Sequence, residues 1–67
     1  IMAKIQLNGK KISLKSNISI LELLKIYGFH KKKIAIELNG IIIPKSNFKK
    51  KLKNKDKIEI VHFIGGG

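Results

Sequence analysis

The chain alternates apolar and polar residues in short runs, a pattern typical of half-buried β-strands. Residues 4–7 begin this alternation and residues 11–15 continue it, with the pair Asn8-Gly9 between them. An Asn-Gly pair favours a two-residue hairpin turn, because both central positions of a type I′ turn need a positive φ. The beginning of the chain therefore predicts a β-hairpin with one face turned toward a core.

A short helix is predicted after this hairpin. Ser19 and Glu22 have the spacing of a capping box, in which each side chain accepts a hydrogen bond from the other residue's main-chain N–H. Gly28 offers the left-handed residue that commonly ends a helix. A helix of two to three turns must lie on a sheet, since it would not be stable alone. Its predicted apolar face consists of Ile20, Leu23, Leu24 and Tyr27.

A second hairpin follows the helix. Residues 34–38 and 41–43 are apolar or alternating and flank another Asn-Gly pair, Asn39-Gly40. Pro44 ends the second of these strands, because proline has no N–H to donate to a central strand. The pattern again predicts two antiparallel strands.

The last part of the chain predicts an irregular turn and a final strand. Phe48 and Leu52 are expected to anchor the turn to the core, and residues 57–64 alternate as a strand. The order of elements predicts an α+β fold, with a mixed sheet of about five strands and one main helix across one face. The final strand is expected to lie between the two hairpins, beside the first strand. We expect residues 1–67 to form a single domain.

Composition limits where such a protein can work. The 67 residues include no cysteine, so disulfides and thiolate metal sites are excluded. No apolar run approaches the ~20 residues that a membrane span needs, and we expect no membrane association. Ile1 precedes Met2, which we expect to be the initiator. The first residues lack a signal-peptide layout, so we expect a cytoplasmic protein, or one of the plastid stroma if an organelle encodes it.

The net charge of +11, with 15 basic and 4 acidic residues, suggests an anionic partner. Every basic residue is lysine, however, and arginine is the residue that makes bidentate contacts with phosphate. Aromatic residues make up 6% of the chain, and none alternates with lysine as a base-stacking surface requires. We therefore do not expect nucleic acid as a partner, although a basic nucleic-acid-binding module remains the alternative from another functional class.

Side chains suited to catalysis are few. His30 and His62 are the two candidates for acid–base chemistry at neutral pH, and neither has a carboxylate at a recognisable spacing. The sequence contains no phosphate-binding loop, metal-binding cluster or nucleophile elbow. We expect capping, turn or cross-strand pairing roles for the acidic residues, Glu22, Glu37, Asp56 and Glu59. The chain is therefore expected to be no enzyme and to hold no cofactor or metal.

Three glycines, Gly65, Gly66 and Gly67, follow the final strand. Glycine has no Cβ, so we expect a flexible tail that enters a slot too narrow for other residues. Fully extended, three residues reach roughly 10 Å. The carboxylate of Gly67 becomes an acyl donor once it is converted to a mixed anhydride, for example by attack on the α-phosphate of ATP. The tail therefore indicates chemistry that takes place in a partner's active site.

The residues just before the tail are apolar. Strand alternation turns at least one of them outward, so Val61, Phe63 and Ile64 are candidates for a small docking contact at the mouth of a partner's tunnel. The alternative is ordinary packing within the sheet, because single exposed apolar side chains are common. Weaker partner binding by Phe63→Ala at unchanged stability would favour docking.

Four stretches of this sequence closely resemble the sulfur-carrier proteins of thiamine biosynthesis, the ThiS family, which have the ubiquitin-like β-grasp fold. Together the stretches cover nearly the whole chain, and the last is the most specific. The lysine excess departs from the family's usual composition. The matching stretches are residues 4–10, residues 18–24, residues 37–40 with Ile43-Pro44, and residues 56–67.

The resemblance implies a carrier that other enzymes act on. An adenylating enzyme related to ubiquitin activators would adenylate Gly67 with ATP and Mg²⁺, and persulfide sulfur from a cysteine desulfurase would displace AMP to leave a thiocarboxylate. Thiazole synthase would take this sulfur. Gly65 and Gly66 would thread the partners' tunnels.

Two related proteins remain as alternatives: the small subunit of molybdopterin synthase and a ubiquitin-like modifier. The first is usually longer and matches residues 61–67 poorly. The second would leave Gly67 joined to lysines of target proteins.

Overall fold

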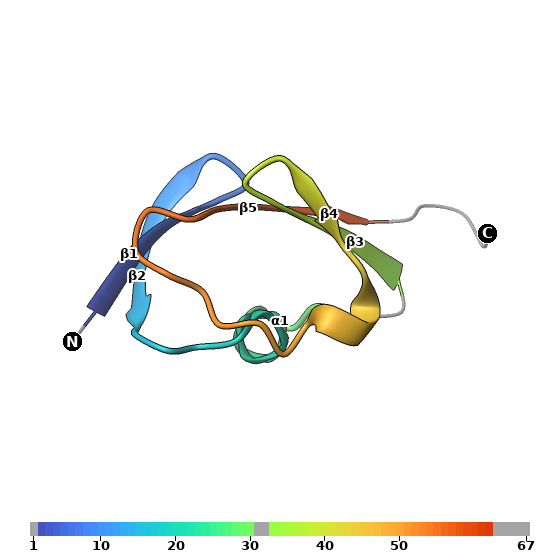
Figure 1. Cartoon of the computed structure of the whole chain (residues 1–67), viewed down its shortest axis with the longest axis horizontal. Coiled ribbons are helices and arrows are strands. Elements are labelled where there is room, and N and C mark those ends of the chain that lie inside the picture. Colours follow the sequence, from blue (N-terminus) through green and yellow to red (C-terminus); the bar gives the residue numbers. More distant parts are fainter. Residues whose placement is uncertain (1, 31–32, 63–67) are drawn as a thin grey trace.

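The computed structural model describes residues 2–30 and 33–62, in which one β-sheet carries one α-helix across one of its faces (Figure 1). The elements are β1 (Met2–Leu7), β2 (Lys10–Lys15), α1 (Ile20–Tyr27), β3 (Ile34–Leu38), β4 (Ile41–Ile43), the 3₁₀ helix η2 (Lys45–Asn47) and β5 (Lys57–His62). The strands lie in the order β2-β1-β5-β3-β4. β1 and β5 run parallel, whereas the other neighbours run antiparallel. This arrangement confirms the predicted mixed sheet, with the last strand between the two hairpins.

Both hairpin turns have the predicted backbone. Asn8 and Gly9 have φ angles of 50° and 84°, and Asn39 and Gly40 have φ angles of 51° and 85°. A positive φ at both central positions matches the right-handed twist of the strands that the turn connects. Each Asn-Gly pair therefore sets the register of its hairpin locally.

The helix begins and ends where the sequence predicts. The Glu22 N–H donates to Ser19 Oγ at 3.1 Å, and the Ser19 N–H donates to Glu22 Oε1 at 3.0 Å, which completes the capping box. Gly28 ends the helix with a φ of 75°. The prediction that Tyr27 belongs to the apolar face of the helix is wrong, because this residue is 45% exposed and lies outside the core. The helix ends at this residue, and the core is closed here by Phe29, which packs against it from the following loop.

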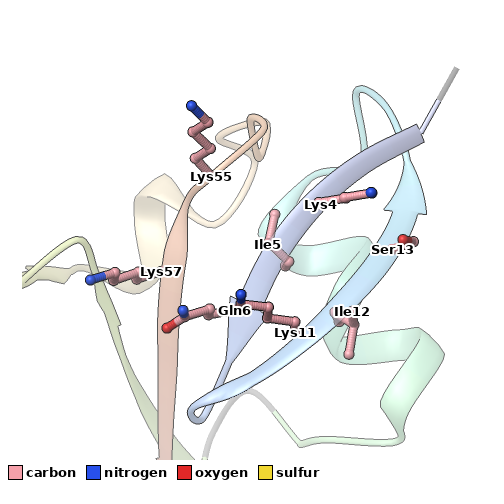
Figure 2. A pocket seen from close by; sticks show the side chains of 8 residues that line it. All are labelled: Lys4, Ile5, Gln6, Lys11, Ile12, Ser13, Lys55 and Lys57. Carbon is pink, nitrogen blue, oxygen red and sulfur yellow. The ribbon is translucent and has the colours of Figure 1, made fainter.

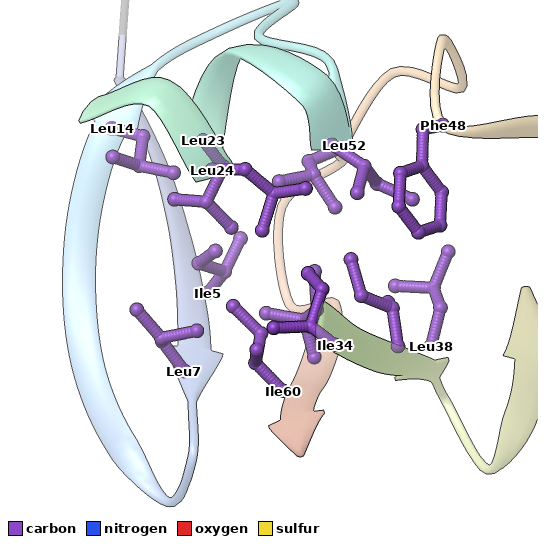
Figure 3. Packing of buried hydrophobic residues seen from close by; sticks show 13 residues of the cluster. Ile5, Leu7, Leu14, Leu23, Leu24, Ile34, Leu38, Phe48, Leu52 and Ile60 are labelled. Atoms are coloured by element: carbon purple, nitrogen blue, oxygen red, sulfur yellow. The ribbon is translucent and has the colours of Figure 1, made fainter. Parts of the chain in front are cut away.

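The core lies between the sheet and the helix (Figure 3). Ile20, Leu23 and Leu24 of α1 are at most 1% exposed and pack onto the inward side chains of the strands. Phe48 and Leu52 are also buried, at 3% and 4% exposure, which confirms that they anchor the irregular segment to the core. The buried side chains of the sheet are Ala3, Ile5, Leu7, Leu14, Ile34, Ile36, Leu38, Ile58 and Ile60.

The capping box predicts a specific dependence of stability on pH. The hydrogen bond from the Ser19 main-chain N–H holds the pKa of Glu22 below its ordinary value of 4.5, with help from the Ser19 hydroxyl and from Lys51, whose Nζ lies 3.9 Å from Glu22 Oε1. A lowered pKa adds stability that is present above the unfolded value and is lost as the pH falls through the folded value. We expect Glu22→Gln, which keeps the side-chain oxygen but cannot ionise, to lose less stability than the natural chain between pH 7 and pH values well below 4.5.

This prediction is measured by urea unfolding at several pH values. Glu59→Gln is the control, because it removes an exposed carboxylate that lies opposite Glu37 and away from the helix cap, and it is not expected to reduce the loss of stability on acidification. The same loss of stability on acidification in Glu22→Gln as in the natural chain would contradict the role of Glu22.

Candidate functional site

The strand that leads to the glycine tail lies in the middle of the sheet. β5 has β1 on one side and β3 on the other, and it ends at the side of the molecule opposite the N-terminus (Figure 1). Residues 63–67 lie outside the described residues. The predicted roles of Phe63 and Ile64 in docking, and of Gly65–Gly67 as a flexible tail, therefore stay predictions.

β5 extends beyond the end of β1. Its pairing with β1 consists of Gln6 with Lys57 and Leu7 with Ile58, whereas its pairing with β3 continues as far as His62. Where β1 ends, the side-chain oxygen of Asn8 accepts a hydrogen bond from the Ile60 N–H at 2.7 Å. Within the described residues, the end of β5 is thus flanked by a strand on one side alone.

This open edge has a chemical consequence. Main-chain N–H and C=O groups at an unpaired strand edge can form a ladder with an extended segment of another protein. The edge lies at the root of the tail, so a partner that receives the tail is well placed to use it. The sequence did not reveal this feature, because the lengths of neighbouring strands depend on contacts between distant residues.

An apolar patch accompanies the open edge on the outward face of the sheet. Val61 is 55% exposed and lies opposite Ala35 on β3, and Ile42 on β4 is 66% exposed. We call Val61, Ala35 and Ile42 the apolar patch. They lie on the face away from the helix, because Ile34, Ile36 and Ile60 beside them are buried and the register places Ile42 next to the outward Glu37. Val61 therefore faces outward just before the tail, whereas its role in docking stays a prediction.

Two carboxylates border the apolar patch. Glu37 and Glu59 are Cα partners on β3 and β5, and both point outward. The expected cross-strand pairing with lysines is wrong for these two residues, because the register places them opposite each other. Like charges directly opposite each other on neighbouring strands are destabilising. The outward face beside the apolar patch therefore carries a pair of carboxylates, although the chain as a whole is strongly basic.

The two histidines occupy separate positions. The ring of His62 packs against Phe29, with ring centroids 5.0 Å apart, and His30 lies exposed in the loop after the helix. Among residues 2–30 and 33–62, no group of three or more His, Cys, Asp or Glu side chains is arranged to hold a metal ion. The described part of the site thus offers a strand edge and a surface for a partner.

The strand order and the single helix across the sheet define a ubiquitin-like β-grasp domain. The crystal structure of the thiamine biosynthesis protein ThiS from Geobacter metallireducens superimposes with a TM-score of 0.82 at 26% sequence identity, covering 96% of this chain and 99% of that one. The sequence matches the ThiS family over residues 3–67. The chain belongs to this family, the sulfur carriers of thiamine biosynthesis.

Three other proteins are similar to this chain in sequence. The sulfur carrier protein ThiS of Bacillus subtilis is 42% identical over 65 residues, which cover 94% of this chain and 98% of that protein. A protein named ycf40 from Pyropia yezoensis is 36% identical over 64 residues, covering 94% of this chain and 90% of the relative. A protein named thiazole synthase from Paramagnetospirillum magneticum is 38% identical over 65 residues, and these form 20% of its length.

Membership of the family makes the chain a small sulfur carrier and not itself a catalyst. In the part of the chain that the structure describes, no helix has the length and hydrophobicity needed to cross a membrane.

Proposed function

We propose that this protein carries sulfur to thiazole synthesis as a thiocarboxylate at Gly67. The observation that carries the proposal is the match to the ThiS family through residue 67, which includes all three glycines of the tail. The similarity to the Bacillus subtilis carrier over almost the whole of both chains supports it further.

The chemistry requires activation of an unreactive carboxylate. In the adenylating enzyme, an oxygen of the Gly67 carboxylate attacks the α-phosphate of ATP, with Mg²⁺ held by that enzyme, and pyrophosphate leaves. A persulfide sulfur supplied by a cysteine desulfurase then attacks the acyl carbon and displaces AMP. A thiol reductant cleaves the remaining S–S bond and leaves the thiocarboxylate. The chain itself needs no cofactor in this scheme.

The fold holds the glycine tail in a position from which it can enter the partners' active sites. Gly65 and Gly66 thread the narrow approach to each active site, since a main chain without Cβ atoms occupies the smallest cross-section. The open edge of β5 and the side chain of Val61 lie at the root of this tail and provide the contact that aligns it. In this proposal Val61, with Phe63 and Ile64, forms the docking contact at the mouth of the tunnel.

Thiazole synthase is the proposed acceptor of the sulfur. A relative with that name contains a segment similar to this chain as one fifth of its length, which supports a working association between the two proteins. We place these reactions in the cytoplasm, or in the plastid stroma if an organelle encodes the protein.

The docking role of Val61 gives a testable prediction. We expect Val61→Ala to weaken binding to the adenylating enzyme roughly fivefold, because the two methyl groups lost amount to about 1 kcal/mol of buried apolar surface. The measurement is isothermal titration with the tail in place. Ile26→Ala is the matched control, because Ile26 is similarly exposed, at 59%, but lies on the helix. Equal affinities for the natural chain and Val61→Ala would contradict docking through the patch.

Genetic complementation tests the proposed function as a whole. A bacterium that lacks its own thiamine sulfur carrier is expected to grow without added thiazole when it expresses this chain. Restored molybdoenzyme activity in a strain without the small subunit of molybdopterin synthase would instead support that alternative. Conjugates of higher mass in cell extracts would support the modifier. Growth that still depends on thiazole, with the chain expressed and folded, would contradict the proposal.

A further inference from the structure

The outward face of the sheet has a basic groove at the end far from the tail (Figure 2). It is a shallow hollow of about 520 Å³. We call it the lysine groove, because half of the residues that line it are lysines. The lining residues are Lys4, Ile5, Gln6, Lys11, Ile12, Ser13, Lys55 and Lys57.

The sheet register arranges these lysines in rows. Gln6 lies between Lys11 on β2 and Lys57 on β5, so these two lysines are two strands apart, or about 10 Å. Lys4 lies two residues before Gln6, about 7 Å along β1. Lys55 is held next to Lys4, because its main-chain N–H donates a hydrogen bond to the Lys4 carbonyl at 2.6 Å. Figure 2 shows the lysine side chains spread over the face and not converging on one point. This geometry suits an extended anionic chain better than a small molecule.

Within the described residues, no ion pair joins a groove lysine to a carboxylate. The one ion pair found there joins Lys51 to Glu22, away from the groove. Glu59 lies two residues after Lys57 on the same face of β5, so a carboxylate borders the groove on one side. The carboxylate of Asp56, adjacent to the groove in sequence, accepts hydrogen bonds from the Lys53 N–H at 2.7 Å and from the Asn39 side chain at 3.0 Å. The residues that line the lysine groove therefore carry charge of one sign.

The structure points to an acidic segment of another protein, in extended conformation, as the ligand of this groove. Alternate side chains of an extended strand lie about 7 Å apart on one face, which is the spacing between the rows of the groove. Nucleic acid fits less well, because the face has no arginine and no aromatic ring on which bases could stack.

The groove and the tail lie at opposite ends of β5, and this separation indicates a role for the interaction. β5 begins at Lys57 in the groove and ends at His62 at the root of the tail, about 17 Å away. An acidic segment held at one end of the sheet therefore leaves the open edge of β5, Val61 and the tail accessible at the other. Through the groove, the carrier stays bound to one protein while its tail enters the active site of another. The inference does not depend on the proposed sulfur chemistry.

Two peptides of equal charge and composition test the inference. One is a fluorescein-labelled (Glu-Thr)₆ peptide, whose carboxylates share one face of a strand, and the other is (Glu-Glu-Thr-Thr)₃. Fluorescence anisotropy at about 50 mM salt is expected to show tighter binding of the alternating peptide, with affinity that falls as salt increases. Equal binding of the two peptides would overturn the proposed strand-like ligand.

Matched triple variants locate the site. Lys4→Gln/Lys11→Gln/Lys57→Gln is expected to weaken binding of the alternating peptide about tenfold, since each exposed charge pair contributes a small amount. Lys25→Gln/Lys49→Gln/Lys50→Gln has the same net charge but alters exposed lysines elsewhere, and a change of less than about threefold is expected. Equal losses in the two variants would show attraction by net charge alone and would overturn the site. Tighter binding of a dT₁₂ oligonucleotide through the groove lysines would overturn the choice of ligand.

Discussion

A chain shortened by Gly67 is expected to fold as the full chain does and to gain no sulfur. The reacting carboxylate would then belong to Gly66, about 3.5 Å short of its place in the partner's active site. Reactions that depend on the alignment of reacting atoms lose about 100-fold in rate for a displacement of 1 Å. The measurement is intact mass after incubation with ATP, the adenylating enzyme, the desulfurase and cysteine.

A variant of full length distinguishes the effect of tail length from the effect of side-chain bulk in the tail. Gly66→Val keeps the carboxylate at its full distance but adds a branched side chain where the tail must pass through a narrow tunnel. We expect loss of sulfur loading here as well, with an unchanged circular dichroism spectrum and melting temperature for both variants. Sulfur loading at the natural rate in the shortened chain would contradict the role of Gly67.

Leu23→Ala is expected to have the largest effect on stability. Leu23 is 0% exposed, at the centre of the core between α1 and the sheet. Removing a buried leucine side chain typically costs about 2–5 kcal/mol, through lost burial and the cavity that remains. A domain of this size is stabilised by roughly 3–10 kcal/mol in total, so the variant is expected to lose a large share of its stability. Urea unfolding followed by circular dichroism measures this loss.

The control for this prediction lies on the same helix. Ile26 is 59% exposed, and Ile26→Ala should change the free energy of unfolding by no more than about 0.5 kcal/mol. The contrast tests the amphipathic character of α1 directly. Similar free energies of unfolding for the two variants would contradict the packing of the helix onto the sheet.

Local signals in the sequence predicted most of the fold. The hairpins depend on Asn-Gly pairs whose positive φ angles are properties of the residues themselves. The helix is bounded by Ser19 with Glu22 at one end and Gly28 at the other, and each boundary involves residues close in sequence. The strand order followed from these elements, because one helix must connect the hairpins across a single face.

Features that depend on distant residues were predicted less well. Tyr27 has the helical spacing of a core residue, but the helix ends there and Phe29 from the next loop packs against the core. The opposition of Glu37 and Glu59 depends on the register between β3 and β5, which no short motif specifies. The lysine groove likewise brings together residues from β1, β2, the start of β5 and the segment before it. The sequence alone therefore did not show which lysines lie together on the surface.

The candidate site was predicted in part. The sequence indicated an outward apolar side chain before the tail, and Val61 has that position. It did not indicate the open edge of β5, because this edge exists only where β1 ends and Asn8 takes over the pairing of Ile60. The role of the glycines came from their chemistry and from the resemblance to the ThiS family.

The most direct test of the central claim is the intact mass of the natural chain after complete reconstitution. The components are ATP, Mg²⁺, the adenylating enzyme, the cysteine desulfurase and cysteine. The account predicts a gain that corresponds to one oxygen replaced by sulfur, dependent on ATP and located in the C-terminal peptide by fragmentation. An unchanged mass, with the same enzymes shown to load another sulfur carrier, would contradict it.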